Sequence, residues 1–163
     1  MTKIIYAPIR EQYVSNNANN NKNRKDNKCP FCNYHNKQDL LVYEGNTAYI
    51  LANKYPYLYG HLLIIPKRHI TDILDLNKDE DKDMMLLIKK AIKLLRETFN
   101  PKGFDIGYQS IYGGASIEHI HFHVVPRFEG DTGFMNMLDD TNIISEKPEE
   151  MVKKLKKKNH IFK

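Results

Sequence analysis

The chain has 163 residues, 41% of them hydrophobic, which is enough for one domain with a substantial core. Much of the formal net charge of +5 lies in residues 16–28 and 153–158, where lysines without interleaved aromatic side chains fit a solvated surface better than a nucleic-acid partner. With no run of 18 apolar residues, no N-terminal apolar stretch and no Gly-rich phosphate loop, we expect a cytoplasmic protein that has no membrane span and no Walker or dinucleotide-binding motif.

Residues 1–28 are interpreted as an N-terminal arm, because their Asn/Lys-rich part favours a partly flexible chain. Regular structure is expected from Cys29 onward. Residues 40–43 and 47–53 predict two strands joined by a Glu-Gly-Asn turn. Residues 60–66, which are nearly all apolar, predict a third strand that ends at a proline.

A long helix is predicted to follow. Asn77 is a suitable N-cap, and Glu80 stands three residues later, as in a capping box. Acidic residues in the first turn suit the positive end of the helix dipole. An Asn-Pro-Lys-Gly sequence at 100–103 predicts the end of the helix. Its apolar stripe consists of Met84, Leu87, Ile88, Ala91, Leu94, Leu95 and Phe99.

Two more strands are predicted at residues 104–110 and 119–127, with a Gly-containing loop at 111–116 between them. Strands, one long helix and further strands favour an α+β fold with a mostly antiparallel five-stranded sheet, one long covering helix and shorter helices. We assign the domain to residues 29–130. Residues 131–163 are expected to form a C-terminal extension with a short basic helix after a proline and a lysine-rich tail.

The most informative feature of the chain is His-Ile-His-Phe-His-Val-Val at 119–125, which contains three of the seven histidines. Alternate side chains of a β-strand share a face, so His119, His121 and His123 would project together, about 7 Å apart. Imidazole is a nucleophile and an acid–base group near neutral pH. A histidine that attacks phosphorus needs its second nitrogen held and donors around the phosphate. Ser116 and the backbone of the preceding Gly-Gly-Ala are candidates for these donors.

A Cys-Pro-Phe-Cys sequence places Cys29 and Cys32 at a spacing that fits a zinc knuckle, a redox dithiol or two buried thiols. The redox alternative is the weaker one without a thioredoxin-like βαβ context. Structural zinc needs two further ligands. The candidates for these ligands are His35, His61, His69, His119 and His160. Taken alone, His61 and His69 are typical of hydrogen-bonded structural histidines, and Asn53 is typical of a turn.

The sequence resembles a known family at these residues. The motif at 119–125 matches the His-φ-His-φ-His-φ-φ signature of the histidine-triad (HIT) nucleotide hydrolases and transferases. Gly-His-Leu-Leu-Ile-Ile-Pro-Lys-Arg-His at 60–69 is similar to the second characteristic segment of that family. Residues 7–13 and 125–135 resemble the branch that includes diadenosine tetraphosphate phosphorylase-like proteins. The resemblance implies an antiparallel sheet with flanking helices, commonly in a homodimer.

Roles for individual residues follow from the resemblance. His121 would be the nucleophile that attacks the α-phosphate and carries the nucleotidyl group, with His123 and His61 beside it. Ser116 and Gln109 would contact the phosphates or the bridging oxygen. The remaining substrate-binding candidates are Asn53 at the ribose, Ile50 and Leu51 at the base pocket, and Gly114 and Ala115 in the loop before the histidines.

A metal site is implied as well. Members of the family with a CxxC at this position resemble the related galactose-1-phosphate uridylyltransferases. In those enzymes the zinc is completed by a histidine after a Pro-x-x-His turn and by the first histidine of the row. The ligands carried over to this chain are Cys29, Cys32, His69 and His119. This set implies a closed structural Zn²⁺ site; no organic cofactor is expected.

The sequence departs from the branch at a few positions. Ile9 stands where the branch usually has Trp, Gln109 stands near a common Asn, Ile111 replaces a frequent Gly, and Gly133 stands where Asn is frequent. We predict a nucleotidyl hydrolase or transferase that cleaves dinucleoside polyphosphates at the α-phosphate through a covalent nucleotidyl-His121 intermediate. An adenosine 5′-phosphoramidase and a nucleotide-binding signalling protein with little catalysis are the alternatives.

Overall fold

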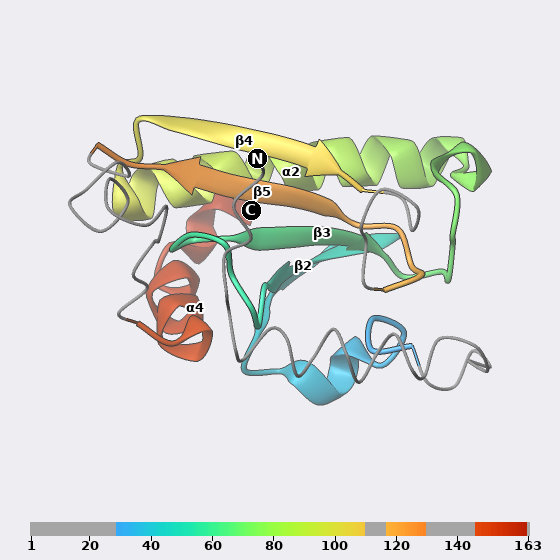
Figure 1. Ribbon diagram of the computed structural model, residues 1–163, viewed down its shortest axis with the longest axis horizontal. Helices are drawn as coiled ribbons and strands as arrows, with labels where there is room; N and C mark the ends of the chain where they lie inside the picture. Colours follow the sequence, from blue (N-terminus) through green and yellow to red (C-terminus); the bar gives the residue numbers. More distant parts are fainter. Residues whose placement is uncertain (1–28, 110–116, 130–145, 163) are drawn as a thin grey trace, which may run out of the picture.

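The computed structural model describes residues 29–109, 117–129 and 146–162. At its centre is a five-stranded sheet in the order β1-β2-β3-β5-β4, and all neighbouring strands are antiparallel (Figure 1). The predicted α+β fold with one long covering helix is confirmed. The elements are β1 (Leu41–Glu44), β2 (Ala48–Ala52), β3 (Leu62–Pro66), β4 (Gly103–Tyr108) and β5 (Phe122–Arg127), with α2 (Lys78–Phe99), α4 (Pro148–Lys156) and the 3₁₀ helices η3 (Tyr34–Lys37), η4 (Ile73–Asp75) and η6 (Asn159–Phe162).

Helix α2 begins and ends where the sequence predicts. The Asn77 side chain accepts hydrogen bonds from the backbone N–H groups of Asp79 and Glu80. The Glu80 carboxylate in turn accepts one from the N–H of Asn77, which completes the capping box. The helix stops at Asn100, which adopts a left-handed conformation with φ of 51°, and Pro101 follows it.

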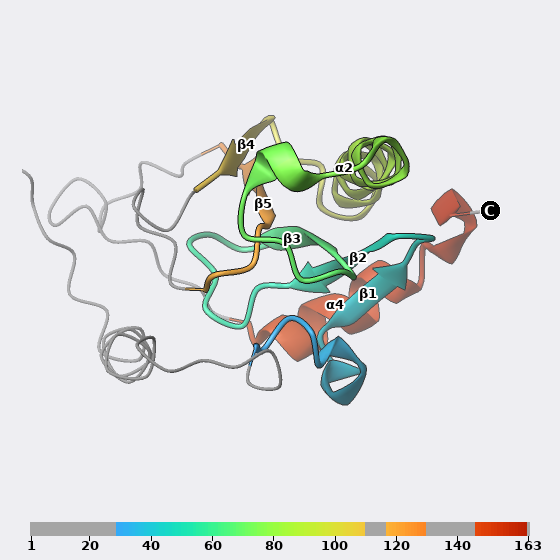
Figure 2. The same cartoon turned by 90° about the vertical axis from the view of Figure 1, so that its right-hand side faces the viewer.

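Helical layers cover the sheet. The apolar stripe of α2 faces β2, β3 and β5, and its members from Met84 to Leu95 are at most 5% exposed. Figure 2 shows α2 on one side of the sheet and η3, in blue, on the other. Helix α4 starts at Pro148, as the predicted short basic helix does, and packs against α2, β1 and β2.

Strand register places His123 on the face that η3 covers. Leu51 pairs with Leu63, and Leu63 pairs with His123, so these three side chains share one face of the sheet. Tyr49 stands two residues before Leu51 and therefore lies on the same face. Its ring stacks on Tyr34 of η3, with the ring centroids 4.0 Å apart. The cysteine-containing segment and the third histidine consequently lie on one side of the sheet.

Strand β5 begins later than the sequence predicts. The prediction placed residues 119–127 in one strand, whereas β5 covers Phe122–Arg127, so that only His123 of the three histidines belongs to it. The expected row of three imidazoles on one strand face is therefore wrong. The ring centroids of His121 and His123 are 4.9 Å apart, closer than the about 7 Å repeat of a strand.

A proline in β3 gives the physical reason. If the pairing of β3 with β5 continued past Phe122, it would bring Pro66 opposite Ile120. Proline has no N–H group to donate to a ladder. The N–H of Ile120 donates instead to the carbonyl of Ile70, at 2.8 Å. His119 and His121 therefore lie outside the sheet, and contacts other than the strand ladder set the orientation of their side chains.

Two buried acidic side chains attach neighbouring loops to α2. Asp83 accepts hydrogen bonds from the backbone N–H groups of Thr47, at 2.7 Å, and Ala48, at 3.0 Å. Glu80 accepts two hydrogen bonds from the Arg68 guanidinium, at 2.9 and 2.7 Å, which holds the pKa of this carboxyl below its usual range. The sequence pattern explained Asp83 by the helix dipole and Glu80 by the dipole and the capping box. Their main contacts are with the turn before β2 and the loop after β3.

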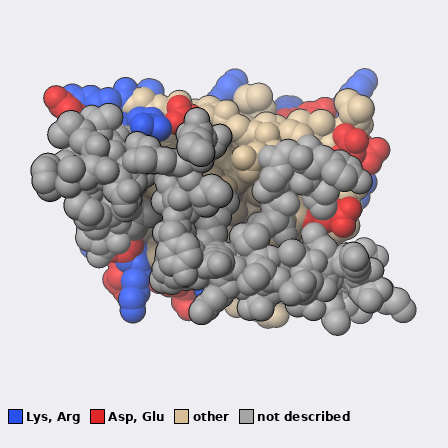
Figure 3. Space-filling view, in the orientation of Figure 1, with Lys and Arg blue, Asp and Glu red and all other residues tan. Residues whose placement is uncertain are grey.

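The described surface mixes both signs of charge. In the view of Figure 3, basic and acidic side chains are interspersed along the margins of the described part of the molecule. Pairs such as Lys102 with Glu129 and Arg127 with Asp105 are exposed, so each contributes little to stability. Among the described helices, none has the length and apolarity needed to span a lipid bilayer.

Gly60→Ala is expected to destabilise the fold by about 1–3 kcal/mol. Gly60 has a φ of 88°, which side chains disfavour, and an added Cβ would lie 2.6 Å from Cγ of Pro126. Urea unfolding measures the change. Gly103→Ala is the matched control, because its added Cβ meets no atom within 4 Å, and its effect should stay within about 0.5 kcal/mol. Equal effects of the two substitutions would contradict this account of Gly60.

Candidate active site and metal centre

Four potential metal ligands from three distant parts of the chain meet at one point. Cys29 and Cys32 precede η3, His69 follows β3, and His119 precedes β5. Their ligand atoms all lie within 4.8 Å of one another. The Sγ of Cys29 is 3.4 Å from Nδ1 of His119, and the Sγ of Cys32 is 3.3 Å from Nδ1 of His69 and 3.7 Å from Nδ1 of His119.

These separations fit a tetrahedral zinc ion. With Zn–S of about 2.3 Å and Zn–N of about 2.0 Å, tetrahedral angles place a sulfur and a nitrogen ligand about 3.5 Å apart. The three S···N distances, 3.3, 3.4 and 3.7 Å, bracket this value. Two thiolates and two imidazoles are also a ligand set that favours zinc over harder cations. The chemistry and the spacing of the cluster therefore both suit Zn²⁺.

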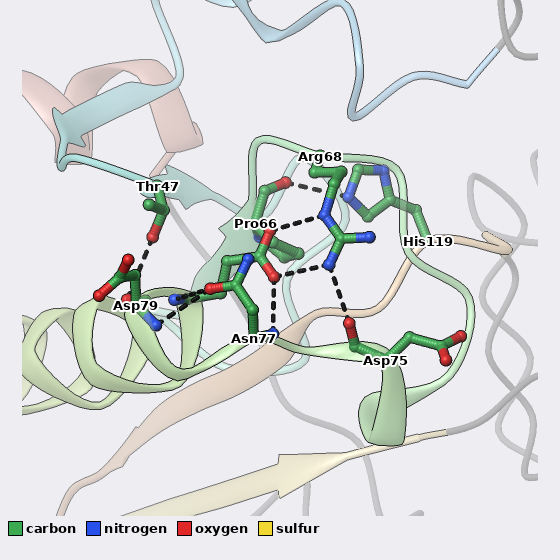
Figure 4. Close-up of polar contacts among 8 residues, drawn as sticks. Thr47, Pro66, Arg68, Asp75, Asn77, Asp79 and His119 are labelled. Atoms are coloured by element: carbon green, nitrogen blue, oxygen red, sulfur yellow. Dashed lines mark hydrogen bonds and ion pairs between the residues drawn. The ribbon is translucent and has the colours of Figure 1, made fainter.

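The outer contacts of His119 prepare its Nδ1 as a ligand. Its Nε2 lies 3.0 Å from the carbonyl oxygen of Pro66, so Nε2 carries the proton and donates it (Figure 4). Nδ1 is then left with a lone pair that faces both cysteines. Burial, together with the neighbouring His69 imidazole, lowers the pKa of His119 to about 4. The ring is consequently neutral near pH 7, as a metal ligand must be.

The loop that carries His69 is anchored at its other side. The Arg68 guanidinium donates to the Glu80 carboxylate on α2 and, at 2.8 Å, to the carbonyl of Asp75 (Figure 4). Arg68 is the residue immediately before His69. Its hydrogen bonds to Glu80 and Asp75 fix the path of the backbone that presents this imidazole.

His121 stands next to the metal cluster with one nitrogen fixed. Its Nδ1 lies 2.8 Å from the carbonyl oxygen of His119, which can only accept, so Nδ1 carries the proton and Nε2 the lone pair. Burial lowers the pKa of His121, which keeps the imidazole neutral. The ring of Phe31 meets it edge-on, with centroids 5.1 Å apart. The result is a buried, neutral imidazole with a nucleophilic Nε2.

The other two predicted catalytic histidines contact each other. Nε2 of His61 lies 2.9 Å from Nδ1 of His123. His61 is fully buried and His123 is 9% exposed. The imidazoles of His123 and His121 stand edge to face, with ring centroids 4.9 Å apart. Three of the four predicted catalytic side chains thus form one cluster; the fourth, Ser116, lies outside the described residues.

The predicted substrate-binding residues are placed unevenly. Asn53 lies beside His61, with its Nδ2 3.2 Å from Nδ1 of that ring. Gln109 is exposed just after β4. Ile50 and Leu51 lie inside β2, 0% and 3% exposed, and only Leu51 is on the sheet face of His123. The predicted loop residues Gly114 and Ala115 lie outside the described part of the chain.

Sequence reasoning missed three participants in this site. Phe31, between the two cysteines, packs against His121. Tyr57 donates its backbone N–H to His61 at 3.1 Å, and its ring lies over His61 and His123, with centroids 4.8 and 5.7 Å away. Pro66 supplies the carbonyl that fixes His119. Only Phe31 had a sequence signal, its place between two candidate ligands; a backbone donor or acceptor leaves none.

Comparison with known proteins gives a consistent result. The family model described as HIT domain matches residues 35–130. The chain is 34% identical over 110 residues to the AP-4-A phosphorylase of Mycobacterium tuberculosis, which covers 66% of this chain and 56% of that protein. It is 31% identical over 96 residues to the bis(5′-adenosyl)-triphosphatase of Dictyostelium discoideum, which covers 58% of this chain and 64% of that protein. The chain therefore spans only about half to two thirds of the length of these relatives.

A solved structure resembles the fold as well. The chain is similar to a histidine triad family protein from Mycobacterium smegmatis that is described as zinc-bound. The TM-score is 0.66 at 25% sequence identity, and the match covers 80% of this chain and 91% of that one.

Proposed function

Because the chain belongs to the HIT domain family, we propose that it is a nucleotidyl hydrolase or transferase that cleaves dinucleoside polyphosphates at the α-phosphate. The names of the mycobacterial and Dictyostelium relatives support this substrate class. One observation carries the chemistry. The hydrogen bond from Nδ1 of His121 to the carbonyl of His119 leaves Nε2 as a lone-pair nucleophile on a neutral ring.

The first step is the attack of that nitrogen on phosphorus. The Nε2 lone pair of His121 forms a P–N bond to the α-phosphate, and the bond from this phosphorus to the bridging oxygen breaks. Its electron pair leaves with the polyphosphate of the second nucleotide. That oxygen becomes part of a terminal phosphate, which is stable as an anion. His123, the neighbour of His121 in the cluster, supplies an N–H donor to the phosphate oxygens, on which negative charge builds up.

The second step releases the nucleotide. Water or inorganic phosphate attacks the same phosphorus, the P–N bond breaks, and its electron pair returns to Nε2 of His121. Water gives a nucleoside monophosphate, with its proton passing to solvent, and phosphate gives a nucleoside diphosphate. The Nδ1–H bond to His119 persists through both steps, so the histidine ends in its starting tautomer.

The proposed metal is a structural Zn²⁺ held by Cys29, Cys32, His69 and His119. When bound, it supplies a cross-link among three chain segments and no catalytic water, because all four positions of a tetrahedron are filled by protein ligands. His119 then joins this site to the nucleophile, since its ring faces the cysteines and its carbonyl holds His121. Ser116, Gly114 and Ala115 are proposed as further donors to the phosphates, and Gln109 as a contact of the leaving group.

Incubation with diadenosine tetraphosphate tests the substrate class. The expected products are AMP and ATP in water, and ADP and ATP when inorganic phosphate is the acceptor. Parallel incubation with adenosine 5′-phosphoramidate separates the rival amidase activity. Turnover of the phosphoramidate alone would overturn the dinucleotide proposal, and turnover of neither would favour a nucleotide-binding protein with little catalysis.

A homodimer is also proposed. Among the described residues, β4 forms an edge of the sheet, and its central residues, among them Ile106 at 49% exposure, are accessible. An edge strand has unpaired backbone groups that a second copy of the chain can cover. Sedimentation equilibrium measures the mass of the particle in solution. A cytoplasmic location remains a prediction from the sequence.

A further inference from the structure

Asn53 and His61 are brought side by side by the closure of the loop between β2 and β3. The backbone N–H of Asn53 donates to the carbonyl of His61 at 3.0 Å, which extends the ladder of the two strands by one pair. The intervening residues 54–60 form the loop. Two residues that are eight apart in sequence therefore face each other across its base.

The orientation of the Asn53 amide is fixed by its neighbour. The backbone N–H of Tyr55 donates to Oδ1 of Asn53 at 3.0 Å, an Asx turn that identifies the oxygen end of the side chain. The amino end, Nδ2, therefore faces His61. It lies 3.2 Å from Nδ1 and 3.5 Å from Nε2 of that ring. We take Nδ1 as the partner of the Asn53 amino group, because this contact is the shorter one and Nε2 already lies 2.9 Å from Nδ1 of His123.

Two donors thus converge on Nδ1 of His61. The second is the backbone N–H of Tyr57, at 3.1 Å. A ring nitrogen that faces two N–H groups must accept, so the proton of neutral His61 is on Nε2. That nitrogen donates to Nδ1 of His123, which must also accept. The proton of neutral His123 is consequently on its own Nε2.

We propose that Asn53 is a positioning residue that holds His61 in the Nε2–H tautomer, and through it presents the Nε2–H of His123 to the phosphate. The catalytic meaning of this presentation rests on the proposed function. The expectation from the family resemblance gave Asn53 only a role at the ribose. In the structure both ends of its amide also make contacts that set a histidine tautomer.

Because His61 is buried, its tautomer depends on the protein groups around it. His61 is fully buried, and the Tyr57 ring lies over both imidazoles. Water that would supply a replacement hydrogen bond is kept away from Nδ1, so removal of the Asn53 donor leaves the Tyr57 N–H to hold the ring and weakens the preference for the Nε2–H tautomer. A change in His61 would pass directly to His123, because they share one hydrogen bond.

Asn53→Asp is the sharpest variant. It keeps the shape of the side chain and the oxygen that accepts from Tyr55, but it replaces the amino donor that faces Nδ1 with an acceptor. The carboxylate oxygen should then favour a proton on Nδ1 of His61, at the expense of the hydrogen bond from the Tyr57 N–H. Asn53→Ala is the comparison, because it removes the Asx turn and the donor together. A purely structural Asx turn predicts that only the alanine variant is impaired.

The first measurement needs no substrate. ¹⁵N chemical shifts of histidine side chains distinguish protonated from bare ring nitrogens. The wild-type protein should show His61 and His123 both protonated on Nε2, and Asn53→Asp should show proton on Nδ1 of His61. A wild-type His61 protonated only on Nδ1 would overturn the proposal, even if no variant folds.

The second measurement is kinetic. Asn53→Asp should lower kcat by about 10- to 100-fold with KM within about threefold, as for lost orientation of a histidine by its partner. The preference for diadenosine tetraphosphate over its 2′-deoxy analogue should stay at the wild-type value. Loss of that preference with unchanged kcat would leave Asn53 with a role at the ribose alone and overturn the positioning role. An inactive wild-type protein with the expected tautomers would count against the proposed function alone.

Discussion

His121→Ala is expected to lower kcat for diadenosine tetraphosphate by at least about 10³-fold while nucleotide affinity stays within about threefold of wild type. Both proposed steps form or break a bond to Nε2 of this ring, and its tautomer is fixed by the carbonyl of His119. Without the ring, no nucleotidyl intermediate forms. Initial rates by chromatography of the products, together with titration of AMP, measure the two quantities.

A trapping experiment tests the same point directly. Wild-type protein mixed with substrate and denatured in alkali, where P–N bonds survive, should gain the mass of one nucleotidyl group, and His121→Ala should not. His160→Ala is the matched control, because His160 lies in the C-terminal part of the chain, is exposed and pairs with Glu97 of α2. Activity of His121→Ala within tenfold of the control would defeat the mechanism.

Cys32→Ser is expected to lose stoichiometric zinc and much of the stability of the fold. The Sγ of Cys32 is within 3.7 Å of both histidine ligand atoms, so its replacement opens the site. Binding at 1,000 times the dissociation constant stabilises a native state by about 4 kcal/mol. For a chain of this size, about 2–4 °C of Tm accompanies each kcal/mol. We therefore expect Tm to fall by about 8–16 °C, with zinc measured by elemental analysis.

A chelator completes this experiment. Removal of zinc from the wild-type protein should lower Tm by about as much as Cys32→Ser does, and the chelator should have no further effect on the variant, because both act on one site. His35→Ala is the control, since His35 is an exposed histidine of η3 that is absent from the cluster. Purified protein without zinc, and equal Tm values of wild type and Cys32→Ser, would remove the metal from the proposal.

Much of the fold was predictable because its signals are local. The capping box of Asn77 and Glu80 is made within one turn of chain, and the apolar stripe of α2 repeats with the period of the helix. Strand positions followed from apolar runs and turns in the same way. The end of the ladder at β5 was missed, because it depends on which strand lies beside His121 and on the proline that this neighbour carries.

The candidate site was likewise predictable only in part. The spacing of the cysteines and histidines, with the family resemblance, named the residues of both the metal cluster and the proposed nucleophile. It did not distinguish a ring nitrogen that donates from one that accepts. That distinction depends on backbone groups such as the Pro66 carbonyl and the Tyr57 N–H. Backbone groups leave no signal in a sequence, and the fold alone determines which side chain they contact.

The sequence by itself therefore determined the class of fold, the family and the set of chemically capable side chains, because composition, periodicity and motif spacing are properties of a linear chain. The tertiary structure decided that His119 faces the cysteines, that His121 carries its lone pair on Nε2, and that Asn53 faces His61. The contacts of His119 with the cysteines and of Asn53 with His61 join residues that only folding brings together, and the short-range contact of His121 with His119 forms just before β5 begins. The direction in which each such bond donates gives otherwise identical imidazoles different roles.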